Sequence, residues 1–292
     1  MNALGAEWLT SLQFGDALGL ATELYQPLGI DRRLFVAADM GFGTDPFSVF
    51  RQGSRIARYE IQTLTAGVDL GATLLDGNAE LRIGAAYIDS SLDRDTGEPG
   101  TLPEGGDKRS GPRLRFVLDT LDSAWLPHRG QRLLVDLRAP TPALGADLDY
   151  RRLLGLWTGA WSRADATLAL RVQYGQAFGD PMPYDQQFPL GGFLHLSGYR
   201  EEQFRGGQTA FGSVTAYRRL PGLTPSWARG LYLGTSLEAG KIADTDPSLT
   251  EPGTRFGGSL FLGLDTLIGP AWLGVGITGD SDTGIYMGAG FP

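Results

Sequence analysis

Polar and apolar side chains alternate with a period of two along most of this chain, and no other feature limits its fold more. In residues 165–175, DATLALRVQYG, the Leu, Val and Tyr side chains share one face of an extended chain, whereas Thr, Arg and Gln share the other. Such alternation is typical of a β-strand with one apolar face. No segment shows a convincing helical period. The sequence therefore predicts an all-β protein.

We expect about fifteen strands, most of them ~9–11 residues long, which is the length of a transmembrane β-strand. The predicted spans are 5–14, 17–27, 33–40, 46–54, 57–73, 78–90, 112–119, 130–138, 148–161, 165–178, 208–219, 229–240, 256–266, 271–279 and 284–291. The Leu, Val and Ile face is expected to contact lipid, because a mid-bilayer Arg or Lys costs ~2–4 kcal/mol. The pattern predicts a transmembrane antiparallel β-barrel.

The connections between these spans differ in length according to the end of the strands at which they lie. The long ones are 91–111, 139–147, 179–207 and 241–255, and an even number of strands separates each from the next. They would therefore share one side, as the outer loops of bacterial barrels do. Such barrels close with an even number of strands, so an odd count predicts a further strand before Met1, for about sixteen in all. The alternative is a miscount by one strand within 46–73.

Composition limits the class of protein further. The net charge of −8 argues against a nucleic-acid partner. Cysteine is absent, which excludes disulfides and thiolate metal sites. The longest nearly apolar run, 153–161, is too short for a spanning helix, which needs ~20 residues. The opening MNALGAEW lacks the features of a secretory signal. We expect residues 1–292 to form one barrel domain, the C-terminal part of a longer exported protein.

Residues 188–207, FPLGGFLHLSGYREEQFRGG, form an unusual loop that is long, glycine-rich and partly apolar. Loops of this length are uncommon unless they are functional or disordered. Its apolar side chains suit contact with protein better than water, and Gly191, Gly192 and Gly198 permit close backbone approach or positive φ. The lumen of a sixteen-stranded barrel is wide enough for a loop. We expect this loop to fold inward and plug the pore.

The same stretch is similar to the lumen-folded loop of the BamA/TamA/FhaC superfamily of outer-membrane assembly and translocation barrels, the bacterial surface antigen family. Gly191-Gly192 matches the glycine pair of that loop. Leu196-Ser197-Gly198-Tyr199 matches its Val-Arg-Gly-Tyr/Phe tip, with Ser197 in place of the Arg. The segment TSLEAGKI resembles the family's Phe-x-Asp-x-Gly wall motif, with Glu238 and Gly240 in the matching places.

The resemblance spans most of residues 110–292. DTLDSAWLPHRG, from Asp119 to Gly130, resembles a recurrent turn of these barrels, and Phe291 resembles their aromatic ending, although Pro292 follows it. The start of the chain looks most like the patatin-linked PlpD branch, in which an LSGY tip replaces the Arg form. The resemblance implies an outer-membrane protein for polypeptide translocation or membrane-protein assembly. Its partner would be a client polypeptide or an upstream patatin-like passenger.

Two hypotheses concern the site residues. Arg200 could replace the missing tip Arg and hold the loop to the wall through a bidentate ion pair with Glu238. The alternative is two separate solvated charges. At the other end, Gly284, Gly288 and Gly290 would weaken the packing of the terminal strand that leads to Phe291. That strand could then pair with a client strand through backbone groups.

Other classes of function find less support in the residues. The chain has two histidines, His128 and His195, both outside the predicted strands, and no G-x-S-x-G motif, so we expect no enzyme. A Ser-His barrel phospholipase would need a histidine on a strand. The acidic stretches 93–99 and 201–203 are more often solvated than Ca²⁺-binding, so we expect no metal and no cofactor. A passive porin, a membrane-anchor barrel and a soluble β-sandwich remain the alternatives.

Overall fold

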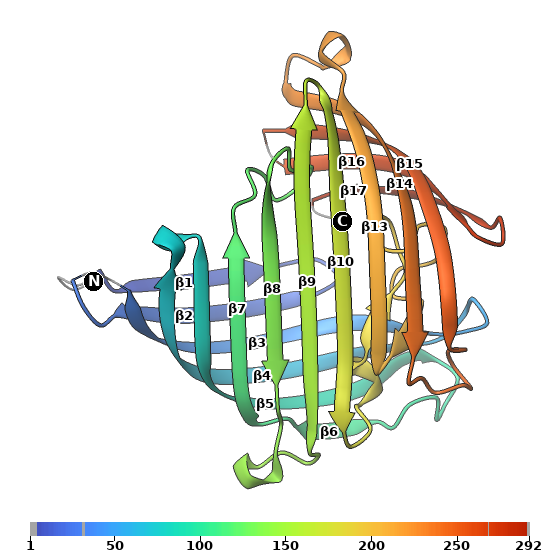
Figure 1. Ribbon diagram of the computed structural model, residues 1–292. Coiled ribbons are helices and arrows are strands. Elements are labelled where there is room, and N and C mark those ends of the chain that lie inside the picture. Colours follow the sequence, from blue (N-terminus) through green and yellow to red (C-terminus); the bar gives the residue numbers. More distant parts are fainter. Residues whose placement is uncertain (1–4, 31–32, 268, 291–292) are drawn as a thin grey trace. The chain divides into compact units, whose positions relative to one another are not determined.

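The computed structural model describes residues 5–30, 33–267 and 269–290, and nearly all of its regular structure is β (Figure 1). The strands are β1 (Glu7–Gln13), β2 (Leu18–Pro27), β3 (Leu34–Arg51), β4 (Ser54–Leu74), β5 (Ala79–Gly97), β6 (Gly105–Lys108), β7 (Gly111–Asp119), β8 (Gly130–Arg138), β9 (Tyr150–Arg163), β10 (Ala166–Gly179), β11 (Phe188–Leu190), β12 (Phe204–Gly206), β13 (Gln208–Arg219), β14 (Ala228–Ala243), β15 (Gly253–Thr266), β16 (Gly269–Thr278) and β17 (Thr283–Ala289). Four 3₁₀ turns, Leu75–Gly77, Pro142–Leu144, Tyr184–Gln186 and Pro221–Leu223, complete the elements. Within the described ranges, no helix is long and apolar enough to span a membrane.

Fifteen of the strands form one sheet in which neighbours in sequence are neighbours in space. Its order is β1-β2-β3-β4-β5-β7-β8-β9-β10-β13-β14-β15-β16-β17, with β6 paired to β5 at the side. β11 and β12 pair separately within the loop that precedes β13. Short antiparallel connections explain this order, because a hairpin needs only a few linking residues. The predicted all-β, antiparallel fold is confirmed.

One predicted boundary is wrong. The spans 33–40 and 46–54 form a single strand, β3, which pairs with β4 along its whole length. The intervening residues 41–45, GFGTD, are typical turn formers, but the 21-residue β4 offers every one of them a backbone partner. Fourteen strands therefore follow one another in the described sheet, besides β6. The odd count from which we inferred a strand before Met1 arose from this split.

The two faces of the sheet differ as the alternation predicts. On β14 and β17 the side chains of Leu237, Ile285 and Met287 are 74–81% exposed, whereas Ser236 and Glu238 on the opposite face are at most 4% exposed. We call the exposed aliphatic face the outer face and the polar face the inner face. The side chains that alternation assigned to lipid thus lie on the outer face.

The four long connections fall at one end of the strands. The strand order places the connections that follow β5, β8, β10 and β14 at one end. The tight links 75–78 and 164–165 and the longer link 120–129 lie at the other. The predicted common side of the long connections is therefore confirmed, although the tight links 14–17 and 52–53 lie on that side as well.

Two compact units divide the chain. Unit 1 comprises residues 1–118, 134–154 and 176–185; unit 2 comprises 119–133, 155–175 and 186–292. Strands β7 to β10 run from one unit into the other, and the loop 188–207 belongs wholly to unit 2. That the chain 1–292 acts as one domain stays a prediction.

Charged side chains on different strands pair along the inner face of unit 1, whose strands β1–β5 are the blue to teal band in Figure 1. The guanidinium of Arg113 on β7 bonds Asp39 on β3 and lies 2.8 Å from Asp69 on β4. Arg82 on β5 lies 2.6 Å from Glu23 on β2. The absence of a side chain at Gly67 leaves the space that the Arg113 guanidinium fills. Ion pairs thus connect strands that are not adjacent in the sheet.

Replacing Arg113 by Gln should destabilise the protein by about 2 kcal/mol, because it leaves the nearly buried Asp69 carboxylate with only the more distant guanidinium of Arg82, at 4.0 Å. The control is Arg94→Gln, whose partner Glu104 is half-exposed, and for which a change below ~1 kcal/mol is expected. Urea unfolding of both variants in detergent measures the difference. Equal midpoints would contradict a structural role for the Arg113 pairs.

Candidate functional site

Glu238 is a carboxylate placed on the inner face of a wall strand and removed from solvent. It lies on β14, where the alternation turns Ser236, Glu238 and Gly240 to the same face, and it is 4% exposed. Across the sheet it pairs in register with Ser213 of β13 and Gly257 of β15. A buried charge of this kind is costly unless polar groups satisfy it.

The tip of the loop 188–207 supplies those polar groups. The backbone N–H groups of Leu196 and Ser197 donate to Glu238 Oε2 at 2.7 and 2.5 Å, and the Ser197 hydroxyl donates to Oε1 at 2.8 Å. From the wall, the Ser236 hydroxyl also donates to Oε1. Hydrogen bonds to an ionised carboxylate are about twice as strong as neutral ones. The carboxylate therefore has two donors at each oxygen and holds the loop tip to β14.

The backbone of the tip is bent to present its N–H groups. Leu194, Leu196 and Gly198 have φ values of +58°, +80° and +100°. A non-glycine residue with positive φ costs on the order of 1–3 kcal/mol and persists only where the surroundings impose it. Alternating conformations of this kind point successive N–H groups at one anion. The tip thus forms a nest around the Glu238 carboxylate, with the Ser197 hydroxyl accepting a further bond from Leu194 N at 2.9 Å.

Glycines of the wall strands let the tip approach closely. A methyl group at Gly257 of β15 would lie 2.5 Å from Ser197 O, and one at Gly276 of β16 would lie 2.5 Å from Gly198 N. One at Gly240 would lie 2.9 Å from the Leu196 side chain. Any other residue at these places would push the loop away from the wall. The three glycines, from adjacent strands, form a bed that fits the backbone of the tip.

Aromatic packing and two further hydrogen bonds extend the contact to the last strands. The Phe193 ring stacks on Trp272 of β16, with centroids 4.5 Å apart. Gly198 N donates to the Tyr286 hydroxyl of β17 at 2.9 Å, and that hydroxyl donates to Tyr199 O at 2.6 Å. Such rings bury much apolar area in a fixed geometry. The loop tip is therefore held by β14, β16 and β17 together.

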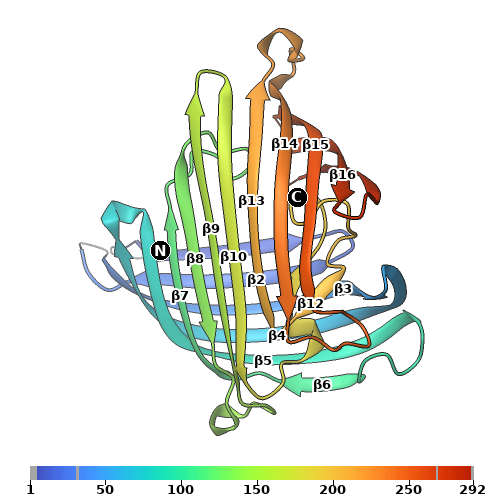
Figure 2. The same cartoon turned by 45° about the vertical axis from the view of Figure 1, so that its right-hand side comes forward.

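At the base of the loop, β11 and β12 form a short hairpin that lies beside β13 and β14 (Figure 2). Between base and tip, His195 Nε2 lies 3.1 Å from Gln173 Oε1 on β10, and its ring packs edge-on against Phe211. Burial, and then the charge of Arg171, lower the pKa of His195 to about 4. The imidazole is therefore neutral at neutral pH and acts as a packing group.

The turn between β7 and β8, residues 119–130, folds onto the inner face from the opposite end of the strands. Asp122 Oδ1 accepts the N–H groups of His128 and Arg129, and the Tyr217 hydroxyl of β13 donates to Pro127 O. The loop tip and this turn meet in one buried cluster, which consists of Leu126, Phe193, Leu194, Tyr217, Tyr232 and Phe261. Segments from both ends of the strands thus pack together on one wall.

The predicted ion pair between Arg200 and Glu238 is wrong. The Arg200 side chain is exposed, and among the residues described no ion pair joins it to Glu238. The Glu238 carboxylate instead accepts hydrogen bonds from Ser197, Leu196 and Ser236. Leu194, Leu196 and Gly198 have positive φ, and the turns that they make before position 200 direct Arg200 away from Glu238. Ser197, which stands in the place of the family arginine, itself makes the contact with the wall.

The other predicted site residues have different outcomes. The structure brings the loop motif together with Glu238 and Gly240: Gly191, Gly192, Leu196, Ser197, Gly198 and Tyr199 all lie in the docked loop. In the last strands, Gly288 lies under the Trp272 ring and Gly290 donates to Pro270 O at 2.8 Å. Gly284 pairs with Gly276 of β16, and Phe291 lies outside the described residues. The loop is folded inward as expected; its role as a plug stays a prediction.

Sequence reasoning missed Tyr286, Ser236 and two glycines of the bed, Gly257 and Gly276. Ser236 and Tyr286 lie on the inner face by alternation, so their direction could have been read from the sequence. Gly257 and Gly276 fall beside Glu238 only once the register of β14, β15 and β16 is known. No local pattern supplies that register.

The described residues offer little for catalysis. None of their serine hydroxyls is hydrogen-bonded to a histidine ring: the Ser197 hydroxyl bonds Glu238, and His195 bonds Gln173. No group of three or more His, Asp and Glu side chains within the described ranges could hold a metal ion. The described residues of the site hold the chain's own loop 188–207.

Replacing Glu238 by Gln should loosen the loop by about 2 kcal/mol, because the bonds to the tip lose their charge assistance and one carboxylate oxygen becomes an amide N–H₂ that cannot accept a hydrogen bond. Trypsin cleavage after Arg200 or Arg205 in the folded protein measures the release. The matched control is Glu201→Gln, an exposed carboxylate in the same loop. If both variants are cleaved at the wild-type rate, Glu238 does not hold the loop.

The glycine bed gives an independent test. Gly257→Ala should displace the tip at a cost of ~1–3 kcal/mol, since the new methyl group overlaps Ser197 O. Gly212→Ala on β13 is the control, because no atom lies closer than 4.0 Å to its added methyl group. A loop that is as resistant to trypsin in Gly257→Ala as in Gly212→Ala would exclude this packing.

Comparisons with known proteins agree with this geometry. Residues 39–218 match the Omp85 superfamily domain. The fold is similar to that of BamA from Haemophilus ducreyi lacking POTRA domains 1–3, with 13% identity and a TM-score of 0.74 over 93% of this chain and 61% of that chain. CdiB from Escherichia coli is similar with 13% identity and a TM-score of 0.63, over 93% of this chain and 52% of that chain. CdiB from Acinetobacter baumannii follows with 13% identity and a TM-score of 0.56, over 90% and 47%.

This chain thus spans about half to three fifths of the length of these structures. No curated protein matches it by sequence. At 13% identity the solved structures show the fold alone, whereas the family model covers more than half of the chain. The protein therefore belongs to the Omp85 superfamily, and its fold is that of the outer-membrane β-barrels of this family.

Proposed function

We propose that this chain is the membrane barrel of a machine that translocates polypeptides across the outer membrane or assembles proteins into it. The observation that carries the proposal is the docked loop tip, which the inner wall holds mainly through backbone groups. Glu238 accepts two backbone N–H groups, and the glycine bed fits a bare main chain. A wall of this kind is suited to hold polypeptide in extended or bent form.

The ends of the sheet support the same proposal. β1 and β17 have seven residues each, and the other strands of the main order have nine or more. Each ends the strand order of the described sheet. An edge strand with unpaired N–H and C=O groups is a template for another strand. In lipid such an edge is costly, which favours pairing with a client.

The finer part of the proposal concerns the client. The resemblance of the start of the chain to the patatin-linked PlpD branch favours an upstream patatin-like passenger, secreted by its own barrel. A passive porin or anchor barrel is the alternative. A porin has no use for a loop fixed by three hydrogen bonds to one buried carboxylate.

Deleting residues 188–207 from the full-length protein in its own bacterium should abolish secretion or assembly of the client while the barrel still reaches the membrane. The reason is that the wall loses the segment that fits its glycine bed. The measurement compares surface-exposed client with the amount of heat-modifiable, folded barrel. Single-channel conductance of the purified variant is recorded in parallel. Normal client export with raised conductance would identify a porin or anchor instead.

Crosslinking provides the second readout of that experiment. A photoreactive residue at Ile285 of β17 should capture the client in cells that carry the intact loop. Leu260 of β15 is the matched control, since it is also exposed on the outer face but lies within the sheet. Equal capture at both positions would mean that the last strand is not the place of contact.

A further inference from the structure

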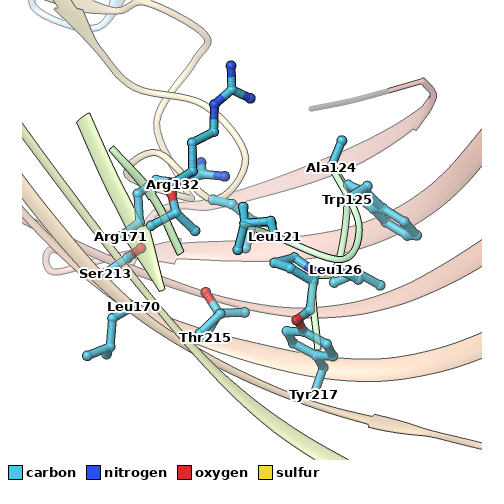
Figure 3. A pocket seen from close by; sticks show the side chains of 14 residues that line it. Leu121, Ala124, Trp125, Leu126, Arg132, Leu170, Arg171, Ser213, Thr215 and Tyr217 are labelled. Carbon is cyan, nitrogen blue, oxygen red and sulfur yellow. The ribbon is translucent and has the colours of Figure 1, made fainter. Parts of the chain in front are cut away.

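A small cavity opens on the inner face of unit 2, between the turn 119–130, the loop tip and the wall strands β9, β10 and β13 (Figure 3). Its volume is about 170 Å³. Leu121 and Leu126 of the turn, Leu194 of the loop tip, and Arg171 and Ser213 of the wall are among the residues that line it. The cavity is separate from the Glu238 carboxylate, whose oxygens the loop tip and Ser236 occupy.

Arg171 brings an uncompensated positive charge to this cavity. It lies on β10, and none of the hydrogen bonds and ion pairs of the described residues involves its guanidinium. The carboxylate that acts on it electrostatically is Glu238, which already receives four hydrogen bonds from other groups. The second arginine of the lining, Arg132, has its own partner, Asp119, at 3.6 Å. Arg171 is therefore free to bind an anion.

The rest of the lining favours an anion with an apolar body. Thr158, Ser213 and Thr215 add hydroxyl groups to the lining, and Leu121, Leu126 and Leu194 add apolar surface. A guanidinium forms two parallel bonds with a carboxylate, which suits this ligand better than a spherical ion. The volume is below the ~300–1,000 Å³ of pockets for drug-sized ligands, so the ligand must be small.

We propose that this cavity binds a small organic carboxylate, with the carboxylate on Arg171 and the apolar body against Leu121, Leu126 and Leu194. The ligand would contact the turn and the loop tip at once, so its binding would hold the two segments together. The same chemistry has two sources. One is a free small carboxylate, and the other is the C-terminal residue of a polypeptide.

Titration calorimetry of the refolded full chain in detergent, with benzoate as the probe, tests the proposal. Benzoate should bind, and benzamide, which has the same shape without the charge, should not. Arg171→Gln should weaken benzoate binding on the order of tenfold to a hundredfold, the effect of losing charge-assisted hydrogen bonds. Arg255→Gln, which removes another inner-face arginine outside the cavity, should leave binding unchanged.

Two further measurements complete the test. Heat-modifiable migration of Arg171→Gln shows that the variant is folded, and Arg171→Lys should recover part of the affinity if charge is what matters. A tripeptide ending in phenylalanine, with a free or an amidated C-terminus, separates the sources. Tighter binding of the free form than of benzoate assigns the site to a polypeptide end, and the reverse order assigns it to a small molecule. No heat with benzoate, equal binding of benzamide, or unchanged affinity in folded Arg171→Gln would overturn the proposal.

Discussion

The buried carboxylate of Glu238 is the interaction on which the arrangement of unit 2 depends. An ionised group that is 4% exposed must be surrounded by donors, and β14 itself offers one, the Ser236 hydroxyl. The remaining three come from the loop tip. The tip in turn adopts positive φ at two leucines, a conformation that is unfavourable without the anion. Neither partner is stable in its observed state alone, so the docked loop and the buried charge require each other.

The two units satisfy their polar inner faces in different ways. In unit 1, charges on different strands neutralise one another, as Arg113 does between Asp39 and Asp69. In unit 2, the inner face of β14–β16 carries glycines, and a folded segment covers them. Ion pairs need long charged side chains that extend from the sheet. A docked segment can approach the sheet closely only where the strands carry glycines instead of such side chains. The distribution of arginine and glycine along the chain therefore gives the wall a part whose charges pair with one another and a part that the loop 188–207 covers.

Much of the fold could be predicted because side-chain alternation is a local property. It places Glu238 on the inner face and Leu237 on the outer face, as the structure has them. The length, glycines and apolar side chains of residues 188–207 are local properties too, and they predicted the inward loop. The errors concern what is decided at a distance. β3 runs through GFGTD because β4 pairs with every residue of it, and that pairing overrides local turn propensity. Likewise, the adjacency of Arg200 to the tip in sequence implied a contact that the backbone turns at Leu194, Leu196 and Gly198 prevent.

The meeting of the loop tip with the turn 119–130 gives the wall a further property. Leu194 from one end of the strands and Leu126 from the other share a cluster with Phe261 of β15, and Tyr286 of β17 packs against the same cluster. Interiors of this density do not deform continuously. A displacement of the loop tip must therefore open a cavity at Leu126 or draw the turn with it. It also removes the two hydrogen bonds that the tip makes with Tyr286. The loop 188–207, the turn 119–130 and the last strand are thus mechanically connected through side chains that come from several different segments.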